Sequence, residues 1–166
     1  VEAQPNIRVM TEATCNAWFT DNWLPVIKGS RLYKVRAKEC IVAAGAYEQH
    51  VVFRNNDLPG VMMCSAAERL MKLYAVKPGN KAVVLAGNDE AYLTALTLAE
   101  QGVQVQALID MRDKAQDSVL SEAVSDAGIK IMTGKTVYEA LPTKGNKHIA
   151  AVDVRSITGQ GKVADS

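Results

Sequence analysis

A strand, a helix and a second strand follow one another in the middle of the chain, and this succession limits the fold more than any other feature. Residues 81–85 and 103–109 are apolar and predict the two strands, and residues 89–101 predict the helix, which Gly102 closes. Two strands joined by a helix within about 30 residues form a βαβ unit, in which the strands run parallel and the crossover is right-handed. We therefore expect an α/β fold: a Rossmann-like domain with a parallel sheet and helices.

The sequence predicts further elements on both sides of this unit. Ser65 and Glu68 have the spacing of a capping box, in which the two residues satisfy each other's free backbone donors, and they predict a helix that begins at Ser65. The remaining predicted elements are a helix over residues 118–127, a strand over 129–132, and a hairpin of strands 137–141 and 148–157 joined through 143–146.

The first 45 residues are typical of a β-meander that precedes this domain. Short strands are predicted over residues 7–10, 15–20, 23–28 and 31–37. Polar and apolar residues alternate in the last of these, as in a half-buried antiparallel strand. Residues 40–45 are instead apolar without interruption, which predicts a strand that is covered on both faces, as in the parallel sheet of an α/β domain.

Composition and charge exclude several classes of function. The 166 residues carry 19 Lys and Arg against 18 Asp and Glu, a net charge of +1 without a basic block, which argues against nucleic-acid or anionic-membrane partners. No apolar run approaches the ~20 residues that span a bilayer, and we recognise no secretory leader. Cys15, Cys40 and Cys64 form no CxxC pair, and two distant histidines offer few zinc ligands. We expect reduced thiols in a cytoplasmic protein without a metal.

The turn between the first strand and the helix of the βαβ unit is where a dinucleotide-binding domain carries GxGxxG. Ala86, Asn88 and Ala91 stand where the three glycines are expected, with Gly87 between the first two. Ala91 is an accepted third residue, whereas the side chain of Asn88 enters the space through which a phosphate approaches. Gly87 and Asn88 lie in the turn where the motif is expected, so they are the candidate cofactor-binding residues of a loop that departs from the motif.

Charged residues around this turn argue both for and against a nucleotide. Asp89 and Glu90 begin the helix, where its dipole favours an anion; a carboxylate ~5 Å from a phosphate costs about 3 kcal/mol at an effective dielectric constant near 20. We expect Asp89 to cap its own helix. Asp110 ends the second strand, at the position where an acidic residue binds the ribose of NAD. Arg112, two residues later, is of the type that binds the 2′-phosphate of NADP, so the choice between the two cofactors stays open. A Rossmann-like unit without a ligand is the favoured interpretation, and an occupied site is the alternative.

Ala44, Gly45 and Ala46 form a second candidate cofactor-binding segment. Small residues at the end of an apolar strand allow the backbone to lie close against a bound cofactor. The alternative is a buried strand that simply meets a loop. We assign no catalytic residue and no metal ligand.

Three stretches of the sequence resemble a known family. Residues 36–48, RAKECIVAAGAYE, are similar to a segment of flavoproteins with two dinucleotide-binding domains. Residues 53–62, FRNNDLPGVM, and 86–92, AGNDEAY, resemble the α subunit of heterotetrameric sarcosine oxidase, in which an Asn-Asp pair stands where related proteins keep glycines. The resemblance runs from about residue 30 to 155. Ala44 departs from the family pattern, which has Thr before the glycine.

The resemblance implies a domain organisation and a parent enzyme. The chain begins at Val1 without an initiator Met, and we expect an internal fragment. Residues 1–49 are then the tail of a first dinucleotide-binding domain, 50–157 an inserted NAD(P)-binding-type domain, and 158–166 the C-terminal tail of the fragment. The family implies a parent complex that oxidises sarcosine with NAD and flavin (FAD or FMN), with other sarcosine oxidase-type subunits as partners. The isolated fragment is expected to be an inactive structural part that binds no cofactor itself.

Two alternatives stay open beside this interpretation. One is a working NAD(P)H-binding domain of a flavin-dependent reductase or of an opine or amine oxidase. The other is a module that docks a partner subunit through residues 55–64. In either case, apolar side chains such as Ile41 and Val42 need cover, so we expect the fragment to self-associate, with strand exchange between copies as one route.

Overall fold

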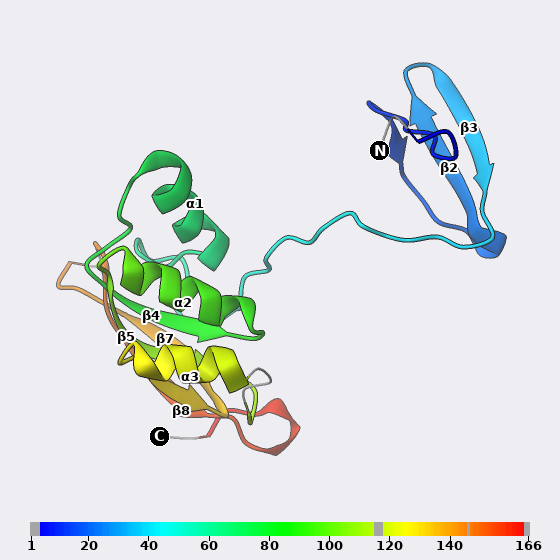
Figure 1. The fold of residues 1–166 in the computed structure, drawn as a ribbon. Coiled ribbons are helices and arrows are strands. Elements are labelled where there is room, and N and C mark those ends of the chain that lie inside the picture. The colour runs from blue at the N-terminus through cyan, green and yellow to red at the C-terminus, as the bar shows by residue number, and fades with distance from the viewer. Residues whose placement is uncertain (1–3, 115–117, 146, 165–166) are drawn as a thin grey trace. The chain divides into compact units, whose positions relative to one another are not determined.

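The computed structural model describes residues 4–114, 118–145 and 147–164, and the chain divides into two compact units (Figure 1). The first unit is Val1–Ala46 and the second is Tyr47–Ser166. Each unit has its own secondary structure and is described by itself. Asn146, which the sequence places in a hairpin loop, lies outside the described residues.

The first unit is a three-stranded antiparallel sheet in the order β1-β2-β3. Its strands are β1 (Thr14–Cys15), β2 (Trp23–Lys28) and β3 (Arg31–Arg36), and a 3-10 helix covers Thr20–Asn22. β2 and β3 form a hairpin whose turn contains Gly29 at a φ of +58°, a left-handed backbone that glycine adopts without strain. The strands predicted over 23–28 and 31–37 are confirmed.

Three other strand predictions in this unit are wrong or too long. Residues 7–10 and 40–45 lie outside any strand, and the strand predicted over 15–20 shrinks to the two residues of β1. The apolar segment 40–45 is irregular and exposed, with 92% of Ile41 and 67% of Val42 accessible to solvent. A strand needs a partner for its N–H and C=O groups, and no described residue donates or accepts a hydrogen bond to this segment.

The second unit is built on a parallel sheet in the order β4-β5-β6. The strands are β4 (Lys81–Ala86), β5 (Gln104–Asp110) and β6 (Lys130–Thr133). Helix α2 (Glu90–Glu100) joins β4 to β5, and α3 (Ser118–Asp126) precedes β6. Both helices lie over one face of the sheet (Figure 1), which confirms the βαβ unit and the α/β fold class.

Two further elements complete this unit. Helix α1 (Cys64–Tyr74) precedes β4 and packs against α2. The predicted hairpin is confirmed as the antiparallel pair β7 (Lys135–Pro142) and β8 (Ile149–Ser156), and a 3-10 helix follows at Gly159–Gly161. The hairpin lies on the side of the sheet away from the helices, and β7 contacts β5 (Figure 1).

The core of the second unit lies between the sheet and its helices. Ala95 on α2, Leu108 on β5 and Val124 on α3 are completely buried there. Burying a side chain of the size of Leu or Val contributes about 1.5–3 kcal/mol each. This packing fixes α2 against β4 and β5, and it therefore fixes the loop at the carboxyl ends of these strands.

The start of α1 differs from the predicted capping box. The helix begins one residue earlier, at Cys64, and neither Ser65 nor Glu68 caps it. The carboxylate of Glu48 accepts the backbone N–H groups of Cys64 at 2.9 Å and of Ser65 at 2.8 Å. Glu68 instead accepts the hydroxyl of Thr94 at 2.6 Å. The capping carboxylate of Glu48 lies 16 residues before Cys64 in the sequence. Rules of local spacing, such as the capping box, do not predict a partner at that separation.

Candidate functional site

The candidate site lies at the carboxyl ends of β4 and β5, the edge of a parallel sheet at which α/β domains bind ligands. Ala86 at the end of β4 pairs in register with Asp110 at the end of β5. The backbone N–H of Met111 donates to the carbonyl of Ala86 at 3.0 Å, which extends this pairing by one bond. The structure thus brings the predicted residues Gly87 and Asn88 to the same end of the sheet as Asp110.

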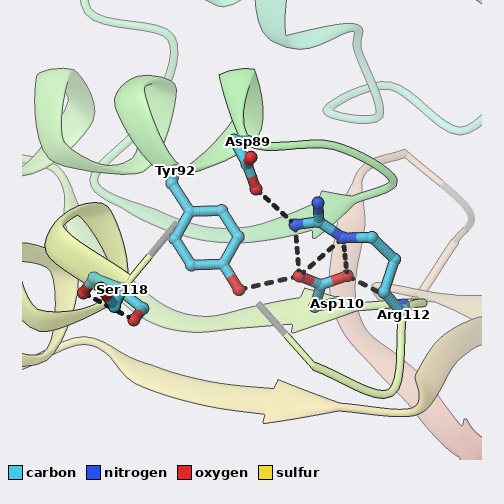
Figure 2. Close-up of polar contacts among 6 residues, drawn as sticks. Asp89, Tyr92, Asp110, Arg112 and Ser118 are labelled. Carbon is cyan, nitrogen blue, oxygen red and sulfur yellow. Dashed lines mark hydrogen bonds and ion pairs between the residues drawn. The ribbon is translucent and has the colours of Figure 1, made fainter. Parts of the chain in front are cut away.

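Asp110 is completely buried, and donors from its own domain surround its carboxylate (Figure 2). Oδ2 accepts the hydroxyl of Tyr92 at 2.8 Å and Nη2 of Arg112 at 2.7 Å. Oδ1 accepts the backbone N–H of Arg112 at 2.9 Å and its Nε at 3.0 Å. A carboxylate has about four lone-pair sites, so these four bonds leave no acceptor for a ribose hydroxyl.

The pKa values in this cluster follow from burial and charge. Burial alone would raise the pKa of Asp110, but the hydrogen bonds from Arg112 and Tyr92 lower it further than burial raises it, so the pKa lies below its usual value. Burial, together with the hydrogen bond to the Asp110 carboxylate, raises the pKa of Tyr92 to about 12. At neutral pH the cluster therefore holds an ionised Asp110, a neutral Tyr92 and a charged Arg112.

Asp89 is part of the same cluster, and the prediction that it caps its own helix is wrong. It stands at the N-cap of α2, but its side chain accepts no hydrogen bond there. Its Oδ1 instead lies 2.8 Å from Nη2 of Arg112, whose guanidinium sits between Asp89 and Asp110 (Figure 2). The guanidinium compensates the negative charge of Asp89, which by itself would repel a phosphate. The repulsion from Asp89 is therefore smaller than expected from the sequence.

Gly87 and Asn88 form the exposed part of the loop. A Cβ atom at Gly87 would lie 3.3 Å from Cε of Met111, which is closer than about nine in ten such contacts in proteins. The absent side chain thus leaves room for Met111 from the neighbouring strand end. Close approach at this glycine serves the packing of the domain itself.

The second candidate segment lies in the first unit. Ala44, Gly45 and Ala46 are exposed and irregular, and Gly45 has a φ of +74°. The sequence predicts that these residues end a buried strand, and this prediction is wrong because residues 40–45 form no strand.

Sequence reasoning missed the two side chains that organise the loop. The sequence prediction gives Tyr92 no role, although its aromatic ring is almost completely buried and its hydroxyl donates to Asp110. It connects Arg112 only with the choice between NAD and NADP. A signal was present in both cases: an arginine two residues after a strand-end aspartate places opposite charges on one short turn, and a tyrosine on the buried face of a helix needs a polar partner.

A second polar cluster surrounds Cys64 at the start of α1. Burial and the negative charge of Glu48 raise the pKa of this thiol to about 11. All three cysteines are free thiols. Across the part of the chain that the structure describes, no three His, Cys, Asp or Glu side chains gather as a metal site would require. The described helices are likewise too short or too polar to cross a bilayer.

Comparison with known proteins shows the family to which the chain belongs. No family model matches the sequence. The sarcosine oxidase α subunit of Corynebacterium sp. (strain P-1) is 36% identical over 113 residues, which cover 68% of the chain and 11% of that protein. The chain is a relative of the sarcosine oxidase α subunit.

Two other α subunits of this enzyme support the relationship. The protein from Corynebacterium sp. (strain U-96) is 33% identical over 140 residues, and that from Rhizobium meliloti (strain 1021) is 29% identical over 170 aligned positions, which cover 93% of the chain. The chain spans 11 to 16% of the length of these three sarcosine oxidase subunits.

Solved structures show the fold of the chain. Thioredoxin reductase of T. acidophilum superimposes with a TM-score of 0.60 at 16% identity, over 92% of the chain and 48% of the reductase. An FAD-dependent pyridine nucleotide-disulphide oxidoreductase of Desulfovibrio vulgaris gives 0.54 at 16% identity, over 93% of the chain and 41% of that protein. These similarities confirm the predicted Rossmann-like fold of the FAD/NAD(P)-binding type.

Proposed function

We propose that the chain is a structural part of an amine oxidoreductase of the sarcosine oxidase α-subunit type, and that it carries no catalytic residue of its own. The relationship to three α subunits supports the parent activity, the oxidative demethylation of sarcosine. NAD and flavin belong to that parent, together with the other subunits that the word "subunit" in the relatives' names implies. Three free thiols support a cytoplasmic location.

The observation that carries the structural role is the position of the Arg112 guanidinium, between Asp89 and Asp110. A dinucleotide at this strand end needs a carboxylate that accepts ribose hydroxyls and a helix start that is open to phosphate. Asp110 is buried and already accepts four protein donors. NADP needs a free arginine for its 2′-phosphate, and Arg112 is held on two carboxylates. The residues present do not fit a dinucleotide in this geometry.

The candidate cofactor-binding residues keep a more limited role in this proposal. Gly87 and Asn88 form a tight connection between β4 and α2, and Asp110 holds Arg112 and Tyr92 in place. Ala44, Gly45 and Ala46 belong to the first dinucleotide-binding domain of the parent, which we infer for residues 1–49. Their function depends on residues of the parent outside this chain.

The proposal predicts that the chain does not bind pyridine nucleotides. Isothermal titration with NAD, NADH and NADPH is expected to give no saturable heat, and melting in the presence of each nucleotide is expected to give no shift. A nucleotide at about 100 times its Kd would stabilise the fold by about 2.7 kcal/mol, a shift of roughly 10 °C for a domain of this size. Micromolar binding would support the alternative, a working NAD(P)H-binding domain.

The parent activity needs a separate measurement on the complete polypeptide with its partner subunits. Oxygen consumption with sarcosine, with other N-methyl amino acids and with opines distinguishes the proposed amine oxidase from a flavin-dependent reductase, which consumes NADH or NADPH instead. Turnover of NADPH without any turnover of an amine would refute the assignment.

Residues 55–64, the alternative docking segment, are tied to the hairpin of their own unit. Nδ2 of Asn55 donates to the carbonyl of Ala140 at 3.0 Å and to Oε1 of Glu139 at 3.1 Å. The backbone N–H of Ile149 donates to the carbonyl of Pro59 at 3.0 Å. These contacts explain Asn55 and the path of the chain at Pro59 without a partner subunit. Replacing Leu58 and Asn56 by Ala in the full complex tests this: loss of assembly would favour the docking role.

A further inference from the structure

Arg112 separates the carboxylate of Asp110 from the solvent. The side chain of Asp110 has no exposed surface, whereas 19% of the Arg112 side chain is exposed. Tyr92 and Arg112 reach the carboxylate from opposite sides (Figure 2), and Tyr92 itself is only 1% exposed. The guanidinium is therefore the outer group of this cluster. All of these contacts form within the second unit, between α2, β5 and the turn that follows β5.

The guanidinium meets the carboxylate at two points. Nε donates to Oδ1 at 3.0 Å and Nη2 donates to Oδ2 at 2.7 Å, so one edge of the guanidinium faces both oxygens of Asp110. A ribose with free 2′- and 3′-hydroxyls likewise carries two neighbouring donors. An acid at the end of the second strand of a βαβ unit accepts the 2′-hydroxyl of a bound nucleotide. Arg112 thus holds the acceptors that such a hydroxyl would use.

The position of Arg112 in the chain makes it a strong competitor for these acceptors. It follows Asp110 by two residues, and its backbone N–H also donates to Oδ1, at 2.9 Å. A group held by so short a connection acts at a high effective concentration, so a free donor of the same chemistry does not displace it. Asp89 adds a second restraint, because its Oδ1 lies 2.8 Å from Nη2 of Arg112.

We propose that Arg112 is an internal substitute for a nucleotide ribose and that its guanidinium keeps Asp110 closed to a ligand. Removing the guanidinium then uncovers a carboxylate that accepts a free 2′-hydroxyl, so the variant binds NAD. The 2′-phosphate of NADP is excluded, because it meets the negative charges of Asp89 and Asp110. This inference rests on the proposed function, in which the wild-type strand end is closed.

Two variants test the proposal by isothermal titration with NAD and NADP. Arg112→Ala uncovers Asp110 but leaves Asp89 uncompensated beside the pyrophosphate, so the second variant combines it with Asp89→Asn. The double variant is expected to bind NAD with a Kd of about 1 mM or below, and NADP at least about tenfold more weakly. The single variant is expected to bind NAD more weakly than the double variant. The wild type is expected to bind neither nucleotide.

Two controls show which group receives the nucleotide. Asp110→Asn, added to the double variant, replaces one acceptor oxygen by an NH₂ donor and is expected to weaken NAD binding at least about tenfold. Arg155→Ala removes another arginine that lies two residues after an aspartate, with Nε 2.9 Å from Oδ2 of Asp153. Because this pair lies outside the Arg112 cluster, the Arg155 variant is expected to bind no nucleotide, like the wild type.

Folding and binding are read together, because Arg112→Ala is expected to lose stability. Circular dichroism of each variant is recorded with and without nucleotide; a variant that folds with NAD and not with NADP supports the proposal, as does binding to a folded variant. If NAD neither binds a folded variant nor folds an unfolded one, or if NADP binds as tightly as NAD, the proposal is overturned while the proposed function stands. NAD binding to the wild type would instead refute the proposed function, and this inference with it.

Discussion

Arg112→Ala is expected to destabilise the second unit by about 3 kcal/mol at neutral pH. The substitution removes the Nε and Nη2 donors from Asp110, a completely buried carboxylate, and leaves Asp89 without its ion-pair partner. Removing one partner of a buried ion pair costs about 3–5 kcal/mol, because the remaining charge is uncompensated. The hydroxyl of Tyr92 and the backbone N–H of residue 112 remain as donors, which places the expected loss at the lower end. Urea unfolding followed by circular dichroism measures it.

The pH dependence gives this prediction a second readout. The pKa of Asp110 in the folded protein is lowered, so its stabilisation is fully present above the unfolded value of about 3.9 and is lost as pH falls through the folded pKa. In Arg112→Ala the main cause of the lowering is absent, and burial raises the pKa of Asp110 against only the hydrogen bonds from Tyr92 and from the backbone N–H of residue 112. Protonation then relieves the uncompensated charge, so the difference in unfolding free energy between wild type and variant is expected to shrink between pH 7 and pH 4.

Asp153 and Arg155 provide a matched control, because they are also an Asp and an Arg two residues apart, with Nε 2.9 Å from Oδ2. This pair is more exposed, and Arg155 also stacks on the ring of Tyr138, so Asp153→Asn is expected to cost less than about 1 kcal/mol. A loss in Arg112→Ala no larger than in this control, or a difference that does not narrow in acid, would refute the claim that Arg112 compensates a buried charge.

Two further predictions concern the start of α1. Glu48→Ala is expected to cost about 1–2 kcal/mol in urea unfolding, since it leaves two backbone N–H groups of the helix without an acceptor, whereas Ser65→Ala is expected to cost less than about 0.5 kcal/mol. Equal losses of unfolding free energy in Glu48→Ala and Ser65→Ala would instead support the predicted capping box. At pH 8 about one Cys64 in a thousand is thiolate, because its pKa is raised to about 11, so iodoacetamide is expected to label the exposed Cys15 well before Cys64. Equal labelling rates in peptide mass spectra would contradict this.

The sequence predicts the second unit well because its elements carry local signals. The apolar runs of β4 and β5, the glycine that ends α2 and the turn residues of the hairpin are all read within a few neighbouring positions. The element boundaries differ from the prediction by one or two residues, at strand ends as well as helix ends, which is the usual uncertainty of such boundaries.

The errors arise where a residue depends on a distant partner. Residues 40–45 have the composition of a buried strand, but composition does not supply the neighbouring strand that makes a ladder. Ser65 and Glu68 have the local spacing of a capping box, yet the carboxylate of Glu48 accepts the backbone N–H of Ser65, which Glu68 would accept in such a box. Glu68 instead accepts the hydroxyl of Thr94, 26 residues away. Neither outcome is visible in a window of a few residues.

The starts of both α1 and α2 carry the partial positive charge that would attract an anionic ligand. In each case a carboxylate of the domain itself already stands at the helix start. Glu48 places its carboxylate on the first N–H groups of α1, and Asp89 at the start of α2 is held by Arg112 rather than left to repel or exchange with a phosphate. A nucleotide that used Asp110 for its ribose or Arg112 for a phosphate would have to break the contacts between Arg112 and its two carboxylates. Since uncovering Asp110 alone is expected to cost about 3 kcal/mol, and a helix start offers at most about 2 kcal/mol to an anion, this strand end favours the closed arrangement.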